Sequence, residues 1–217
     1  MLALKKRFLL VLAMLTLAAG QVWAGPEEEL RLYVDENTQK LVEKLNNEKD
    51  LYKEDSEAFY SAMDETLDQF VDFRRIAARV MGRYARQTTP EQRDDFVERF
   101  KRSLFDAYAQ ALVDADDFQM KVQDAEILPN NEDRASVQME LTSSDGSRYS
   151  ITYSMYKNKE NRWLMENVIV EGVNIGLAFR DRFAQEMEQN RGQIQAVIDG
   201  WGSAVESLKL EEEMDQS

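Results

Sequence analysis

The feature that most limits the fold of this chain is a change in the spacing of its apolar residues. Up to Asp117 they recur every three or four positions, which is the spacing along one face of an α-helix. From Phe118 to Val170 they recur at every second position, which is the spacing along one face of a β-strand. After Gly176 the helical spacing returns. The order helices, strands, helices predicts an α+β fold.

Four helices are predicted before the strands, over residues 26–46, 56–70, 73–86 and 90–115. Asp55 has the position of an N-cap for the second helix, and the ten polar-rich residues 46–55 before it are expected to form a connector. Thr89 and Gln92 form a capping box around Pro90, which predicts the start of the fourth helix.

Four consecutive strands are predicted around residues 118–122, 137–141, 149–155 and 163–170. Asp145-Gly146 is a strong signal for a tight hairpin between the second and third. Because the connections are short, we expect a curved four-stranded antiparallel sheet with helices covering one face. The last helical region has Phe179, Phe183 and Met187 on one face and is expected to break at Gly192.

Residues 1–24 have the pattern of a secretory signal peptide. Three cations near the start precede an apolar run of about a dozen residues, shorter than the roughly 20 that span a bilayer, and small residues precede a cut after Ala24. We therefore expect an exported, soluble protein. Residues 25–210 are predicted to form one compact unit, which can be divided into a helical lobe and a sheet lobe, and residues 211–217 a flexible acidic tail.

Composition excludes several classes of function. The chain has no Cys and no His, so disulfides and the commonest general base and metal ligand are missing. Its net charge is −14, and removal of the three signal-peptide cations makes it −17, which disfavours nucleic-acid binding. Neither GxxxxGK[ST] nor GxGxxG occurs. We predict a protein that is not an enzyme and that holds no cofactor.

The segment "VIVEGVNIGLAFRDRF", residues 168–183, has more apolar residues than a closing strand needs. Core packing explains most runs of this kind. A wall of a cavity for an apolar ligand uses the same residue types, so periodicity does not separate the two interpretations.

Charged residues form two further groups. Arg75, Arg79, Arg83 and Arg86 are three or four positions apart and are expected to share one helix face. That face is either a solvated surface or a docking surface for an acidic partner or a phosphate. The carboxylates around residues 114–117 and 132–133 lack the spacing and the glycine of a calcium loop, so no metal site is predicted.

Three stretches resemble a known family. They are residues 71–112, the strand that begins at Trp163, and residues 168–183, with the specific pieces "VMGRY" (80–84), "TPEQR" (89–93), Glu171-Gly172-Val173 and Phe179-Arg180. Together with the sequence from Leu30 to about Trp201, they resemble MlaC, the toluene-tolerance family of periplasmic phospholipid-binding proteins.

The resemblance implies a periplasmic carrier of the Mla pathway, with the acyl chains of a glycerophospholipid in an apolar cavity and the headgroup in water. Its implied partners are an outer-membrane lipoprotein complex and an inner-membrane ABC transporter with its substrate-binding domain subunits. Under this interpretation the acyl-lining residues are Leu104, Phe105, Tyr108, Tyr149, Ile151, Tyr153, Val168, Val170, Val173 and Ile175. Arg180 is expected near the phosphate, and the partner surface is expected at Arg75, Arg79, Arg83 and Arg86. The alternative is a periplasmic adaptor or chaperone with a filled core.

Overall fold

A computed structural model of the chain describes residues 25–114 and 118–207. The predicted signal peptide and the predicted acidic tail lie outside these residues. The helices before the sheet are α2 (Pro26–Glu54), α3 (Ser56–Leu67), α4 (Phe73–Met81), the 3-10 helix η1 (Gly82–Arg86) and α5 (Pro90–Asp114). After the sheet come α6 (Ile175–Gln189), α7 (Ile194–Asp199) and a helical stretch over residues 201–207. None of the helices described is both long and apolar enough to span a membrane.

The sheet is antiparallel, and its strands lie in the order in which they occur in the sequence. They are β1 (Gln119–Ile127), β2 (Arg134–Thr142), β3 (Arg148–Lys157), β4 (Trp163–Val170) and β5 (Val173–Asn174). The predicted α+β class is confirmed, but the sheet has five strands and not four. The two-residue strand β5 was missed because it follows β4 through the two-residue turn Glu171-Gly172. Both turn residues have positive φ, 49° and 82°, as a type I′ hairpin requires.

The predicted connector over residues 46–55 is wrong, because α2 continues through it to Glu54. Apolar contacts explain the extension: Tyr52 packs edge-on against Phe59 of α3, with ring centroids 5.3 Å apart. Asp55 caps α3 as predicted, since its side chain accepts a hydrogen bond of 3.0 Å from the backbone N–H of Ala58. The two helices therefore meet at a sharp corner with no loop between them.

The predicted helix over residues 73–86 is divided in two. Gly82 has φ 54°, a backbone conformation that side chains with a Cβ rarely adopt, and α4 ends immediately before it. The 3-10 helix η1 follows. The capping box at the start of α5 is confirmed, because Gln92 and Thr89 each donate a backbone N–H to the other's side chain, at 3.2 and 3.1 Å.

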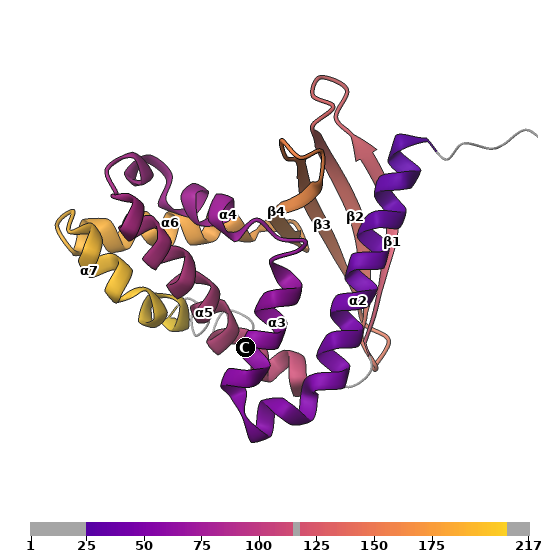
Figure 1. The fold of residues 1–217 in the computed structure, drawn as a ribbon, viewed down its shortest axis with the longest axis horizontal. Helices are drawn as coiled ribbons and strands as arrows, with labels where there is room; N and C mark the ends of the chain where they lie inside the picture. Colours follow the sequence, from indigo (N-terminus) through magenta and orange to yellow (C-terminus); the bar gives the residue numbers. More distant parts are fainter. Residues whose placement is uncertain (1–24, 115–117, 208–217) are drawn as a thin grey trace, which may run out of the picture.

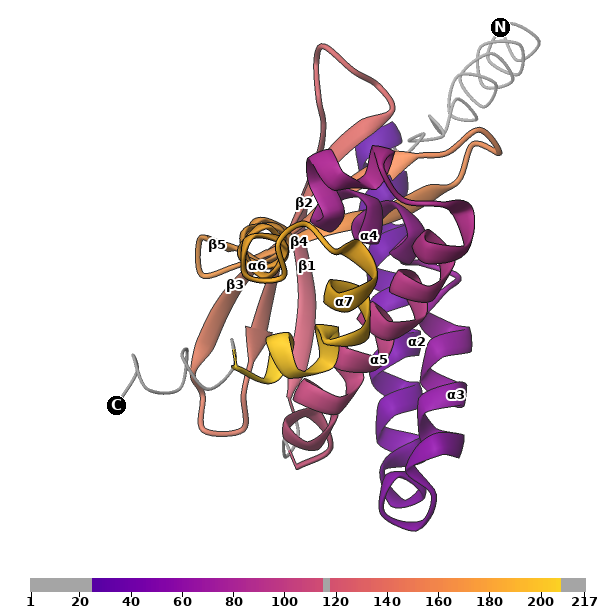
Figure 2. The ribbon, with the colours of Figure 1, turned by 90° about the vertical axis from the view of Figure 1, so that its left-hand side faces the viewer.

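Three clusters of buried apolar side chains hold these elements together. The first joins α4, α5, α6 and α7 around Phe96, Phe183 and Trp201. The second lies between α2 and the sheet and includes Val137. The third joins α2, α3 and α5 around Phe59. In Figure 1, α2 runs along β1 while α4, α6 and α7 lie on the opposite side of the molecule, and Figure 2 shows the sheet beside the long helices. The three clusters therefore connect the sheet and both groups of helices.

Candidate functional site

An apolar cavity of about 350 Å³ lies where the three clusters meet. Its walls come from α2, α3, α4, α5, β4 and α6, and from the segment between α3 and α4. The apolar lining residues are Leu45, Phe59, Met63, Leu67, Val71, Phe73, Ile76, Phe100, Leu104, Phe105, Ala109, Met165, Val168, Ile175 and Phe179. The lining thus contains members of all three clusters, and the packing of the clusters leaves a space between them.

Few polar groups reach this apolar cavity. The ammonium of Lys101 is one of them, and it donates a hydrogen bond of 2.9 Å to the carboxylate of Asp64. The others are Tyr60, Tyr108 and Asn167. Because the only charged pair described in the lining is already joined, the interior offers an apolar environment with no free charge.

The capacity of the apolar cavity follows from its volume. A water molecule occupies about 30 Å³ of liquid, and a methylene group is of similar size. The cavity of about 350 Å³ therefore has room for about a dozen methylene groups. This is the size range of small-molecule sites, which enclose about 300–1,000 Å³.

Five of the ten residues predicted to line an acyl cavity lie on the wall of this one. Leu104, Phe105 and Tyr108 reach it from α5. Val168 reaches it from β4, and Ile175 from the first turn of α6. The structure therefore brings together the helix and the strand that the sequence had linked only through the resemblance.

The other five predicted residues do not line the apolar cavity. Ile151 is buried in the filled cluster between α2 and the sheet, and Tyr153 packs against that cluster. Burial raises the pKa of Tyr153 to about 12. Val170 and Val173 pair across the hairpin between β4 and β5. Val173 is 55% exposed and Tyr149 is 43% exposed. Any contact of these five with acyl chains stays a prediction.

The prediction missed a complete wall of the apolar cavity, which comes from α3. Phe59, Met63 and Leu67 are spaced four residues apart and line it together. That spacing was visible in the sequence, but a helix face that packs on a core and one that borders a cavity have the same pattern.

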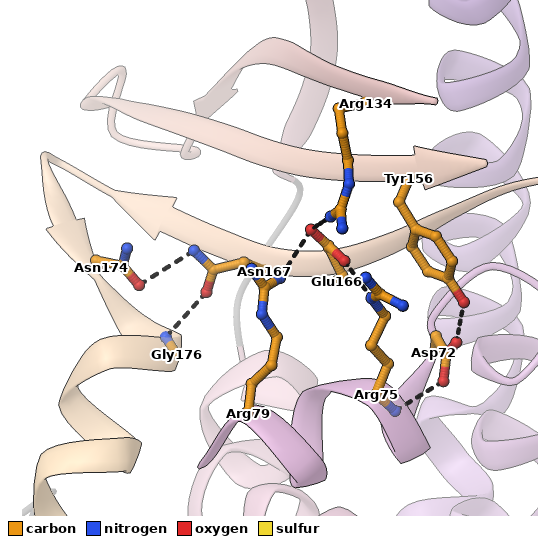
Figure 3. A network of polar contacts seen from close by, with 9 residues as sticks. All are labelled: Asp72, Arg75, Arg79, Arg134, Tyr156, Glu166, Asn167, Asn174 and Gly176. Atoms are coloured by element: carbon orange, nitrogen blue, oxygen red, sulfur yellow. Dashed lines mark hydrogen bonds and ion pairs between the residues drawn. The ribbon is translucent and has the colours of Figure 1, made fainter. Parts of the chain in front are cut away.

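A cluster of charged side chains lies beside the apolar cavity, between α4 and the sheet (Figure 3). At its centre is the carboxylate of Glu166, which is only 4% exposed. It forms ion pairs with Arg75 at 2.5 Å, with Arg79 at 2.7 Å, and with Arg134 of β2. We call these four residues the Glu166 cluster. Three cations around one buried anion leave an excess of positive charge in an otherwise acidic protein.

Next to the Glu166 cluster, Tyr156 donates a hydrogen bond to the carboxylate of Asp72, which also caps α4 by accepting the backbone N–H of Arg75 at 2.8 Å. Burial, together with the bond to Asp72, raises the pKa of Tyr156 to about 12. The guanidinium of Arg75 lies over the Tyr156 ring, 4.1 Å from its centroid. These contacts fix the start of α4 against the sheet.

A second space, of about 380 Å³, opens beside the apolar cavity and is polar. We call it the polar hollow. Its lining residues are Ile76, Arg79, Val80, Glu166, Asn167, Asn174, Gly176, Leu177 and Arg180. Three of them, Ile76, Asn167 and Gly176, also line the apolar cavity. The two spaces are therefore neighbours that share a wall.

The four arginines predicted as a partner surface do not share one helix face. Arg75 and Arg79 lie on α4 and are engaged by Glu166. Arg83 and Arg86 lie beyond Gly82 on η1, where both are exposed. A partner surface at these arginines stays a prediction. Among the described residues, no group of three or more acidic side chains is placed to hold a metal ion.

Comparison with known families matches residues 35–203 to the family described as "MlaC protein". The chain belongs to this family. A curated relative, the toluene tolerance protein ttg2D of Pseudomonas putida, is 36% identical over 210 residues, which is 96% of this chain and 94% of the relative. The intermembrane phospholipid transport system binding protein MlaC of Haemophilus influenzae is 21% identical over 79% of this chain and 81% of its own.

The fold is also that of a solved structure. A phospholipid-binding protein of Ralstonia solanacearum, determined in complex with a phospholipid, superposes with a TM-score of 0.71 at 18% identity. The match covers 83% of this chain and 98% of the other. At this identity the comparison establishes the shared α+β architecture.

Proposed function

We propose that this MlaC-family protein is a non-enzymatic phospholipid carrier whose apolar cavity holds acyl chains. The observation that carries the proposal is the apolar cavity itself, which lies between three packed clusters and has an almost wholly apolar lining. The alternative, an adaptor with a filled core, gives no reason for such a space.

The energetics favour an occupant. In well-packed proteins, cavities destabilise by about 24 cal/mol per Å³, so a dry void of 350 Å³ would cost up to about 8 kcal/mol. Typical domains are stable by only about 5–15 kcal/mol. About a dozen methylene groups placed there would gain about 10 kcal/mol, at 0.8 kcal/mol each. This gain favours an acyl chain as the occupant of the apolar cavity.

The apolar cavity has room for only part of a diacyl lipid. Two chains of about sixteen carbons contain more than twice the methylene groups for which the cavity has room. A complete diacyl lipid would therefore extend beyond the apolar cavity or widen it on loading.

The descriptions of two similar proteins support a phospholipid as the ligand and transport between membranes as the role. One is described as an intermembrane phospholipid transport system binding protein, and the Ralstonia protein was solved with a phospholipid. We place this chain in the periplasm after removal of residues 1–24. Its partners there would be an outer-membrane lipoprotein complex and an inner-membrane ABC transporter with its substrate-binding domain subunits. Since the chain has no nucleotide-binding motif, the direction of transport would come from these partners.

A transfer assay tests the proposal. Donor vesicles that contain a fluorescent phospholipid are mixed with unlabelled acceptor vesicles, with and without the mature protein. The proposal predicts that the rate of transfer rises in proportion to protein concentration. A rate equal to that without protein would contradict a carrier function.

A further inference from the structure

Two arginines are the positively charged residues in the lining of the polar hollow. Arg79 reaches it from α4, and Arg180 reaches it from α6. The side chains are 53% and 54% exposed, so both guanidinium groups remain accessible to a ligand. Guanidinium groups bind phosphate oxygens through paired, charge-assisted hydrogen bonds.

Arg79 can leave its present partner at low cost. Its guanidinium pairs with Glu166, but the same carboxylate is also bound by Arg75 and Arg134. If Arg79 turned toward an anion, two cations would still neutralise the buried Glu166. The Glu166 cluster therefore holds Arg79 beside the polar hollow, and the positive charge of Arg79 is not needed to neutralise Glu166.

Arg180 is positioned by packing. A Cβ added to Gly82 would lie 3.5 Å from the Cδ of Arg180, so the aliphatic part of this side chain passes over the glycine. Among the described residues, its guanidinium forms one long ion pair, with Asp181 at 3.8 Å. Its stem is thus supported at the turn between α4 and η1, while its charged end faces the polar hollow.

The backbone at the start of α6 contributes little to anion binding here. The N–H of Gly176 donates to the side chain of Asn167 at 3.1 Å, and the N–H of Leu177 donates to Asn174 at 3.0 Å (Figure 3 shows the first of these). Both donors are occupied. The positively charged groups that can recognise an anion in the polar hollow are therefore the two arginines.

We propose that the polar hollow is a phosphate site, in which Arg79 and Arg180 bind the phosphodiester of a lipid whose acyl chains occupy the adjoining apolar cavity. The proposal rests on the carrier function. It adds a specific recognition element to it, because the wall shared through Ile76, Asn167 and Gly176 places the polar hollow directly next to the apolar space. A lipid with a phosphate would then be preferred to a neutral lipid with the same chains.

The test compares two soluble lipids by calorimetry, dihexanoyl phosphatidylglycerol and dihexanoylglycerol, which differ in the phosphate-containing headgroup. The proteins are the mature wild type, Arg180→Gln, and the double variant Arg79→Gln/Arg180→Gln. Arg74→Gln is the matched control, since Arg74 lies on the same helix but pairs with Asp94 on the exposed surface. Circular dichroism and thermal unfolding establish that each variant is folded.

We expect the wild type and Arg74→Gln to bind the phospholipid at least tenfold more tightly than the neutral lipid. The double variant should lose about tenfold or more in affinity for the phospholipid, because charge-assisted bonds contribute about 1.5–3 kcal/mol each, and it should bind the neutral lipid unchanged. Arg180→Gln alone should show an intermediate loss, which keeps the test informative if the double variant does not fold.

Equal affinity of the wild type and Arg180→Gln for the phospholipid would overturn the phosphate site while leaving the carrier function intact. Failure of the wild type to bind either lipid would contradict the carrier function as well. Inorganic phosphate is the third probe: if it saturated the polar hollow of the lipid-free protein while the substitutions left phospholipid binding unchanged, the site would serve free phosphate and the lipid assignment would fail.

Discussion

Val168→Glu is the substitution that tests the apolar cavity most selectively. Val168 lies on β4 and faces the cavity, whereas its neighbour Ile169 does not line it. Successive side chains of a strand point to opposite faces. The substitution therefore places a carboxylate at the acyl-chain position without changing the pairing of β3 with β4.

The size of the effect follows from the cavity volume. If the space of about 350 Å³ holds about a dozen methylene groups, an acyl chain gains about 10 kcal/mol there. A carboxylate at residue 168 and the water that solvates it would displace at least four of these groups. That loss is about 3 kcal/mol, which lowers lipid affinity more than a hundredfold. The protein should remain folded, since a cavity that admits water can solvate the charge.

The assay measures phospholipid that co-purifies with each variant, after solvent extraction, together with the free energy of unfolding in urea. Ile169→Glu is the control for the other face of the same strand and should keep its lipid. Ile151→Glu is the control for a filled core. Ile151 is 8% exposed within the cluster between α2 and the sheet, so an unpaired charge there should cost several kcal/mol and unfold the domain.

Two results would refute this reasoning. One is a folded Val168→Glu protein that carries as much phospholipid as the wild type. The other is an equal loss of lipid from folded Ile169→Glu protein, since the effect would then not depend on the side chain that faces the apolar cavity.

Three further predictions concern stability. Glu166→Gln removes the carboxylate that three arginines share and should lower the free energy of unfolding by about 3 kcal/mol in urea denaturation; a change below a few tenths of a kcal/mol would show that the cluster is solvated. Thr89→Ala removes the cap of α5 and should cost about 1 kcal/mol in the same assay, whereas Thr89→Ser should cost much less. Tyr153 and Tyr156 have pKa values of about 12, against about 10 for an unfolded tyrosine, so the stability they contribute is complete below pH 10 and is lost as pH rises through 12. Absorbance titration should show these two phenols ionising last, near pH 12, and Tyr156→Phe should remove one of them; a single transition near pH 10 for all tyrosines would contradict this.

Much of the fold was predictable because it is encoded locally. The change in apolar spacing near Asp117 separated helices from strands, and Asp55 and Thr89 marked helix starts that the structure confirms. The errors have tertiary causes. The polar end of α2 remains helical because Tyr52 packs on another helix, and α4 ends at Gly82 although the apolar spacing continues past it.

The candidate site was predictable only in part. Sequence periodicity identifies the inward face of α5, but it does not distinguish a cavity wall from a filled core. For this reason the cavity wall formed by α3 was missed, and Ile151, which lies in a filled core, was included among the lining residues. The Glu166 cluster was not foreseen either, because Arg134 and Glu166 lie 32 positions apart and meet only through the pairing of β2, β3 and β4. Contacts of this kind depend on strand register, which no local pattern specifies.

The central claim is that the apolar cavity holds a phospholipid, and native mass spectrometry of the gently purified mature protein tests it most directly. The account predicts a species heavier than the polypeptide by the mass of bound phospholipid, which disappears on solvent extraction and returns on incubation with phospholipid vesicles. A protein that is folded, that is found only at the polypeptide mass, and that never takes up phospholipid from vesicles would contradict the account.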